Sequence, residues 1–137
     1  MTSERAVRLR GLYAITPGLS DTRLLCERVE RALAGGAAIV QYRAKDFDAT
    51  LAIEQARRIG AICRGAGALF LVNDSIELAR VCGADGVHVG RDDAGVAQAR
   101  RDLPRAIIGV SCYDDPSRAA EVDNIRQELE HGPRDED

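Results

Sequence analysis

Residues 69–93 read LFLVNDSIELARVCGADGVHVGRDD, and this stretch contains one complete repeat of the pattern that organises the chain. The apolar runs Leu69–Asn73 and Gly86–Val89 are short and bounded by turn residues, which predicts strands that are buried on both faces. Between them, Ser75–Cys82 shows helical periodicity. Two buried strands joined by a helix predict a right-handed βαβ unit with parallel strands.

The same alternation extends along the chain in both directions. Further strands are expected at Leu12–Thr16, Ala38–Arg43 and Ala106–Ser111. Further helices are expected after a cap at Ser20 or Asp21 as far as Gly35-Gly36, after Asp48 with Gly65 beyond the end, at Ala94–Leu103, and from Asp115-Pro116. Five such units predict an α/β fold with a parallel sheet. The periodicity alone fits both an open doubly wound sheet and a (β/α)8 barrel.

The alternation ends after Val122, and this sets the expected domain boundary. Residues 123–137 contain six acidic residues, two arginines and no apolar run that could form a sixth strand. We therefore expect one partial barrel domain over residues 1–122. Residues 123–137 are expected to extend the last helix and to end in a disordered acidic tail.

Composition excludes several classes of function. The net charge is −3, which provides no basic patch for nucleic acid. No signal peptide is apparent and no apolar run approaches the ~20 residues of a membrane span, so we expect a cytoplasmic protein. The four cysteines are widely spaced, without a C-x-x-C pair, and the two histidines stand apart, so no zinc-like spacing exists. We interpret the cysteines as small apolar packing residues.

Polar residues gather where the expected strands end. They are Gln41, Arg43 and Lys45 on the second strand, Asn73-Asp74 on the third, residues 90–93 after the fourth, and Ser111 on the fifth. In α/β folds, ligands bind at the carboxyl ends of the strands. Two cations suit a phosphate or diphosphate, and carboxylates without histidine or thiolate suit Mg²⁺. The alternative interpretation is a solvated edge whose aspartates are ordinary helix caps.

Two further polar residues are interpreted as structural. His88 lies inside the fourth expected strand, away from its end, which favours a packed and hydrogen-bonded histidine. Asp85 and Asp92 are expected to serve as loop or capping residues.

Four motifs in register resemble the thiamine-phosphate synthase family. They are Q-Y-R-A-K at 41–45, V-N-D at 72–74, G-A-D-G-V-H-V-G-R-D-D at 83–93 and I-G-V-S at 108–111, and G-L-Y-A-I-T at 11–16 is similar to the family's first strand. The resemblance covers about residues 10–122. It implies a (β/α)8 TIM-barrel fold, of which this chain would contain about five βα units.

The resemblance also implies a reaction and a site. The family couples hydroxymethylpyrimidine diphosphate with thiazole phosphate, both small-molecule substrates, to give thiamine phosphate and pyrophosphate. Carried across, Gln41, Arg43, Lys45, Asn73 and Ser111 would bind the pyrimidine diphosphate, and Asp74 and Asp93 would bind Mg²⁺. No residue is assigned as a nucleophile or base, because such a step needs charge neutralisation and alignment of the substrates.

From Glu121 onward the sequence departs from the family pattern. The family continues with a G-A-D-Y-type strand, a Thr-rich loop that ends in Lys, and two more strands that supply the thiazole-phosphate site. We therefore expect a synthase whose second substrate site is missing from this sequence. Two alternatives stay open, namely a non-catalytic remnant that binds ligand weakly or pairs with another chain, and an enzyme similar to thiazole tautomerase. An open arc of five strands would expose two edges and an apolar inner face, which predicts self-association.

Overall fold

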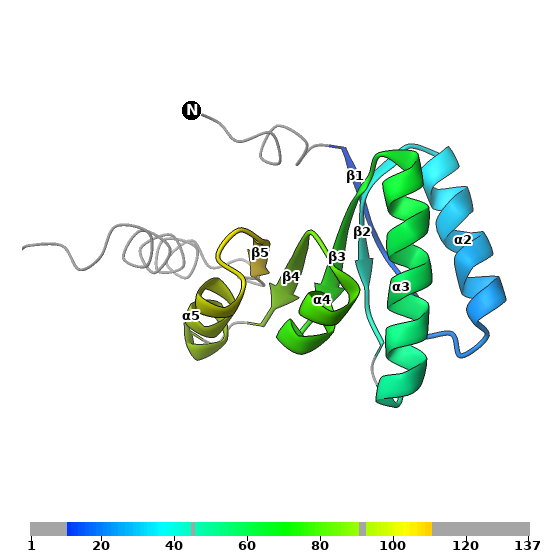
Figure 1. Ribbon diagram of the computed structural model, residues 1–137. Helices are drawn as coiled ribbons and strands as arrows, with labels where there is room; N and C mark the ends of the chain where they lie inside the picture. The colour runs from blue at the N-terminus through cyan, green and yellow to red at the C-terminus, as the bar shows by residue number, and fades with distance from the viewer. Residues whose placement is uncertain (1–10, 45, 91–92, 111–137) are drawn as a thin grey trace, which may run out of the picture.

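Five parallel strands alternate with four helices in the described part of the chain (Figure 1). The computed structural model describes residues 11–44, 46–90 and 93–110. The strands are β1 (Leu12–Ile15), β2 (Ala37–Tyr42), β3 (Leu69–Asn73), β4 (Gly86–Val89) and β5 (Ile107–Val110). The helices are α2 (Thr22–Ala34), α3 (Ala49–Ala66), α4 (Ile76–Cys82) and α5 (Asp93–Asp102). All five expected strands form, each with bounds within one residue of the prediction. The expected helix from Asp115-Pro116 and the tail at 123–137 lie outside the described residues.

The strand order identifies the architecture. The sheet runs β1-β2-β3-β4-β5, so each strand pairs in parallel with its successor in the chain. Doubly wound sheets instead reverse their strand order at a switch point. Buried side chains of all four helices join alternate strand residues in a single core: Val40, Tyr42, Phe70, Val72, Val87 and Val89. The helices therefore cover the same face of the sheet, as in an arc of a (β/α) barrel.

The opposite, inner face of the sheet is formed by the remaining strand residues. Ile39, Leu69 and Leu71 make a second apolar cluster, with Ile107 packed against it. The prediction of an exposed apolar inner face is wrong for these three residues, which are at most 5% exposed. They pack against one another and against Ala38 and Ile107. The exposed large apolar residues of the sheet lie on the edge strand β1, where Leu12 is 58% exposed.

Local chemistry explains where three of the helices begin. Asp21, Asp48 and Ser75 are the N-caps of α2, α3 and α4, and each side chain accepts a hydrogen bond from the backbone N–H three residues on, at 3.1, 2.8 and 3.0 Å. The expected end of α3 before Gly65 is wrong. The helix continues to Ala66 and is capped by Gly67, whose φ of 73° is the left-handed conformation that glycine adopts without strain.

Two expectations from composition concern the cysteines and the membrane. Cys63 and Cys82 are buried in the core between helices and sheet, which confirms their interpretation as packing residues. Burial raises the pKa of the Cys63 thiol to about 11. Cys112 lies outside the described residues.

Over the ranges that the structure describes, no helix combines the length and the apolar character needed to cross a membrane.

Candidate functional site

The carboxyl ends of the five parallel strands define one edge of the sheet, where the predicted site residues were expected. Gln41 lies near the end of β2 and Arg43 follows that strand directly. Asn73 is the last residue of β3, Asp74 comes next, and Asp93 is the first residue of α5, after β4. Lys45 and Ser111 lie outside the described residues, as does the side chain of Asp93. The structure thus brings four of the predicted side chains to this edge.

A chain of hydrogen bonds crosses the three neighbouring strands β1, β2 and β3. The Asn73 side chain donates from Nδ2 to Gln41 Oε1 at 3.0 Å. Gln41 in turn donates from Nε2 to the Tyr13 hydroxyl oxygen at 2.8 Å. Gln41 is only 3% exposed, so it lies beneath the edge and connects the residues on either side of it. Tyr13 was not among the predicted site residues, although its position on the first strand, on the same face as Gln41, could have indicated it.

Arg43 combines a fixed backbone with an exposed side chain. Its backbone N–H donates to the Thr16 hydroxyl at 3.0 Å, and the Thr16 N–H donates to the Gln41 carbonyl at 2.9 Å. Thr16 is nearly buried, at 7% exposure. It therefore ties the end of β1 to the end of β2 and leaves the guanidinium of Arg43 facing solvent. The sequence does not predict this role of Thr16, because a threonine at the end of a strand carries no motif that distinguishes it from other threonines.

Asp74 has a strained backbone at the end of β3. Its φ of 62° lies in the left-handed region, which costs a residue other than glycine about 1–3 kcal/mol. Its N–H donates to the His88 carbonyl at 2.7 Å, which holds this conformation in place. The alternative interpretation of Asp74 as a helix cap is wrong, because Ser75 caps α4. The Asp74 carboxylate is exposed at the edge and is available to a ligand or a metal ion.

His88 occupies the inner face of β4, in register with Asn73 and with Gly109. A Cβ atom added to Gly109 would lie 2.6 Å from His88 Nδ1, so the imidazole packs directly over the glycine backbone. Burial lowers the pKa of His88, and the Asp74 carboxylate opposes that shift. The contact with Gly109 confirms that His88 is a packed side chain, and its expected side-chain hydrogen bond stays a prediction.

Asp85 lies at the opposite edge of the sheet, where the parallel strands begin. Its carboxylate accepts a hydrogen bond from the Phe70 N–H at 2.8 Å, and its own N–H donates to the Phe70 carbonyl at 2.9 Å. Asp85 therefore anchors the start of β3, which confirms the structural role expected for it. Asp92 lies outside the described residues.

A second buried network stiffens the end of β2 from the helix side. The Tyr42 hydroxyl donates to Gln55 Oε1 at 2.6 Å, and Gln55 Nε2 donates to the Leu19 carbonyl at 2.9 Å and to the Thr22 hydroxyl at 3.2 Å. Gln55 is fully buried, and burial raises the pKa of Tyr42 to about 12. Because its amide is hydrogen-bonded on both sides, this polar residue is tolerated in the core. It fixes the β1–α2 loop against β2.

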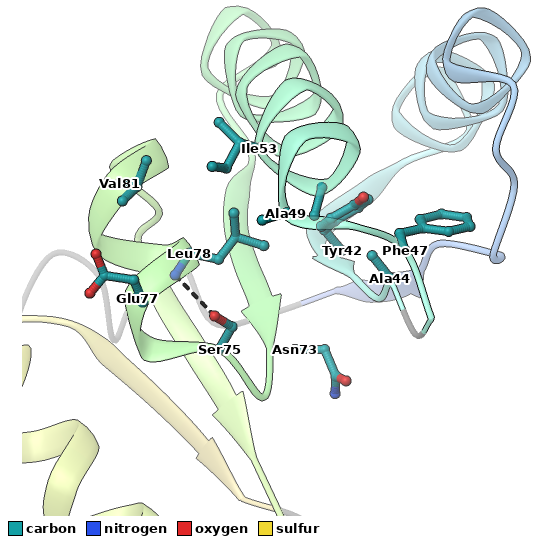
Figure 2. Close-up of a pocket in the computed structure, with 11 residues that line it drawn as sticks. Tyr42, Ala44, Phe47, Ala49, Ile53, Asn73, Ser75, Glu77, Leu78 and Val81 are labelled. Carbon is teal, nitrogen blue, oxygen red and sulfur yellow. Dashed lines mark hydrogen bonds between the residues drawn. The ribbon is translucent and has the colours of Figure 1, made fainter.

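An apolar pocket of about 320 Å³ lies beside the edge, between α3 and α4 (Figure 2). It is lined by Tyr42, Ala44, Phe47, Ala49, Ala52, Ile53, Asn73, Ser75, Glu77, Leu78 and Val81. Figure 2 shows Ile53 and Leu78 facing it from the two helices, with Asn73 at the end of β3. The described residues that line it include no lysine or arginine, so the pocket is poorly suited to a diphosphate, whose oxygens need cations or N–H donors.

The described residues suit a magnesium ion that is shared with a ligand better than a metal held by protein alone. Among them, no cluster of three or more His, Cys, Asp or Glu side chains is arranged to hold a metal. Mg²⁺ commonly binds through one or two carboxylates and completes its shell with water and phosphate oxygens. The exposed carboxylate of Asp74 fits that pattern. Asp93 begins the helix after the neighbouring strand, and its side chain lies outside the described residues.

Comparison with known proteins gives consistent matches. The family model for thiamine monophosphate synthase matches residues 12–127. A thiamine-phosphate synthase from Aromatoleum aromaticum is 56% identical over 113 residues, covering 82% of this chain and 54% of that protein. A thiamine-phosphate synthase from Chromobacterium violaceum is 55% identical over 109 residues, covering 78% of this chain and 52% of that protein. A thiamine phosphate pyrophosphorylase structure from Pyrococcus furiosus superposes with a TM-score of 0.75 at 34% identity, covering 86% of this chain and 56% of that one. The chain thus spans about half the length of the relatives it matches.

Proposed function

Since the chain belongs to the thiamine monophosphate synthase family, we propose that it forms the pyrimidine-diphosphate site of a thiamine-phosphate synthase. The reaction would couple hydroxymethylpyrimidine diphosphate to thiazole phosphate and release pyrophosphate, in the cytoplasm. One observation carries the proposal: Arg43 and Asp74 present opposite charges at the same edge of the sheet. The backbone N–H of Arg43 donates to Thr16, just after β1, and that of Asp74 donates to His88 in β4, which holds both residues in place.

The proposed mechanism depends on neutralising the leaving group. When the bond between the pyrimidine methylene carbon and the diphosphate oxygen breaks, negative charge grows on the diphosphate. The Arg43 guanidinium, with Lys45 two residues later, would stabilise that charge by charge-assisted hydrogen bonds. Asn73 and Ser111 would orient the pyrimidine diphosphate, and Gln41 would hold Asn73 in position through their hydrogen bond. No protein nucleophile or general base is required.

Asp74 and Asp93 would hold Mg²⁺, which when bound supplies further positive charge to the diphosphate oxygens. The strained conformation of Asp74 supports this role, since backbone strain is commonly retained at functional sites. A diphosphate site also favours a synthase over a thiazole tautomerase, because a tautomerase has no diphosphate to bind.

Replacing Asp74 with asparagine tests the proposal. Asparagine tolerates the left-handed conformation, so the fold should be kept while the carboxylate charge is lost. We expect the variant to bind pyrophosphate about tenfold more weakly than the wild type in the presence of Mg²⁺, equivalent to about 1.4 kcal/mol. Isothermal titration calorimetry at fixed Mg²⁺, repeated with EDTA, measures the difference.

The matched control is Asp102→Asn, an exposed aspartate at the far end of α5. It should bind as the wild type does. With EDTA, the Asp74 variant should bind no more weakly than the wild type, because without Mg²⁺ the carboxylate only repels the diphosphate. The proposal is wrong if Asp74→Asn and Asp102→Asn give the same Mg²⁺-dependent affinity.

A further inference from the structure

The apolar pocket between α3 and α4 has no role in the reaction proposed above, and it exists because small residues line one of its sides. Ala49 and Ala52 lie one turn apart on α3, and Ala44 lies just after β2. Their methyl groups leave open a space that larger side chains would fill. Leu78 and Val81 of α4 form the opposite side (Figure 2). The result is a hollow of about 320 Å³ with mainly aliphatic walls.

The polar groups of the pocket restrict the charge of an occupant. Among the described residues that line it, the only charged side chain is that of Glu77, which is exposed and already paired with Arg80. The Tyr42 hydroxyl donates to Gln55 within the core. An anionic group would find no cation here and would lose its hydration without compensation. A cation would meet a carboxylate that already has its partner, so the pocket suits a neutral molecule.

The volume and one remaining polar group indicate the size and type of the occupant. An apolar cavity of about 150 Å³ binds benzene, so a hollow of about twice that volume accommodates two fused rings. Ser75 lines the pocket, and its Oγ accepts a hydrogen bond from the Leu78 N–H at 3.0 Å. A hydroxyl also has a proton and a second lone pair, which suffice for one polar atom of a ligand. Water is poorly held in an apolar hollow, so a ring that displaces it gains affinity.

We propose that the pocket between α3 and α4 is a binding site for a small neutral aromatic molecule of two fused rings with one polar atom. The inference goes beyond the proposed function and does not depend on it. The two sites select opposite chemistry, since Arg43 and Asp74 present charges at the edge of the sheet and the pocket presents aliphatic walls. Asn73 lies where the two sites adjoin, so the test includes a competition between their ligands.

Indole is the probe for this site, because it is neutral, has two fused rings and carries a single N–H. The full chain, labelled with carbon-13, is titrated with indole while the methyl signals of Ile53, Leu78 and Val81 are followed by NMR. We expect saturable shifts at these three residues. Indole-3-carboxylate has the same rings and a negative charge, and it should bind about tenfold more weakly. Excess pyrophosphate with Mg²⁺ should not displace indole.

Substitutions on the two helices test the location of the site. Ala52→Phe should abolish the saturable shifts, because the added ring occupies the hollow. The matched control is Ala61→Phe, which adds the same ring at an exposed position of α3 and should bind indole as the wild type does. Val81→Ala provides a second variant that should fold normally, since Val81 is 38% exposed. Its loss of two methyl groups should weaken indole binding about threefold.

The outcomes separate this inference from the proposed function. The inference is overturned if indole gives no saturable shift at the three residues, or if indole-3-carboxylate binds as tightly as indole. It is also overturned if Val81→Ala binds indole as the wild type does, or if Ala52→Phe does so while its circular dichroism shows a native fold. Displacement of indole by pyrophosphate would show that the pocket belongs to the diphosphate site. A chain that binds indole but not pyrophosphate contradicts the proposed function and supports this inference.

Discussion

Replacing Arg43 with alanine should weaken the binding of pyrophosphate with Mg²⁺ by about 10- to 150-fold, which corresponds to about 1.5–3 kcal/mol for a charge-assisted hydrogen bond. The effect should be large because the guanidinium is exposed to the ligand while its backbone is held by Thr16. The free energy of unfolding should change little, since the side chain is not part of the core. Isothermal titration calorimetry gives the affinity, and urea denaturation checks the fold.

The control for this prediction is Arg23→Ala. Arg23 is also an exposed arginine, 89% exposed and paired with Glu27 on the surface of α2, so its removal should leave pyrophosphate binding unchanged. Equal affinities for the Arg43 and Arg23 variants would mean that the anion does not bind at the end of β2.

Replacing Gly86 with alanine should cost more stability than any surface substitution in the chain, by about 4 kcal/mol or more. Gly86 begins β4 and pairs with Ile107 of β5. An added Cβ would overlap the Ile107 carbonyl oxygen and lie 2.8 Å from its carbonyl carbon, and backbone atoms of a paired strand cannot move aside as a flexible side chain can. The clash should separate β4 from β5. Urea denaturation followed by circular dichroism measures the loss.

Gly65→Ala is the matched control for this substitution. Gly65 lies inside α3, and a Cβ added there meets no atom within 4 Å. Alanine is favoured over glycine in a helix by about 0.5–1 kcal/mol, so this variant should be slightly more stable than the wild type. If Gly86→Ala unfolds at the same urea concentration as the wild type, the close pairing of β4 and β5 is wrong.

The sequence could predict the elements of the fold but not their neighbours in space. Apolar periodicity reports which residues face a core, and it located all five strands within a residue. It cannot report strand order, so the periodicity fits both a doubly wound sheet and a barrel, and the four motifs that resemble a family favour the barrel. Helix ends show the same limit. Gly65 and Gly67 look alike as stop signals, and only the left-handed conformation of Gly67 decides between them.

The positions of the candidate site residues were predictable where the end of a strand alone determines them. Asn73 is the last residue of a strand and Arg43 and Asp74 directly follow strands, and the ends of parallel strands meet at one edge whatever the side-chain details. The contacts beneath that edge were not predictable. Gln41 connects Asn73 to Tyr13 through hydrogen bonds between residues 28 and 32 positions apart, and such contacts depend on register and rotamer. The strained backbone of Asp74 likewise has no signature in the sequence.

The most direct measurement of the central claim maps the ligand onto the molecule. The full chain, labelled with nitrogen-15, is titrated with hydroxymethylpyrimidine diphosphate, with and without Mg²⁺, while backbone amide signals are followed by NMR. We expect saturable, Mg²⁺-dependent shifts at residues 41–43 and 73–74 and at Asp93, with no change at the opposite edge near Gly67 and Asp85. Saturable shifts confined to that opposite edge, or no saturable shifts at all, would contradict the account.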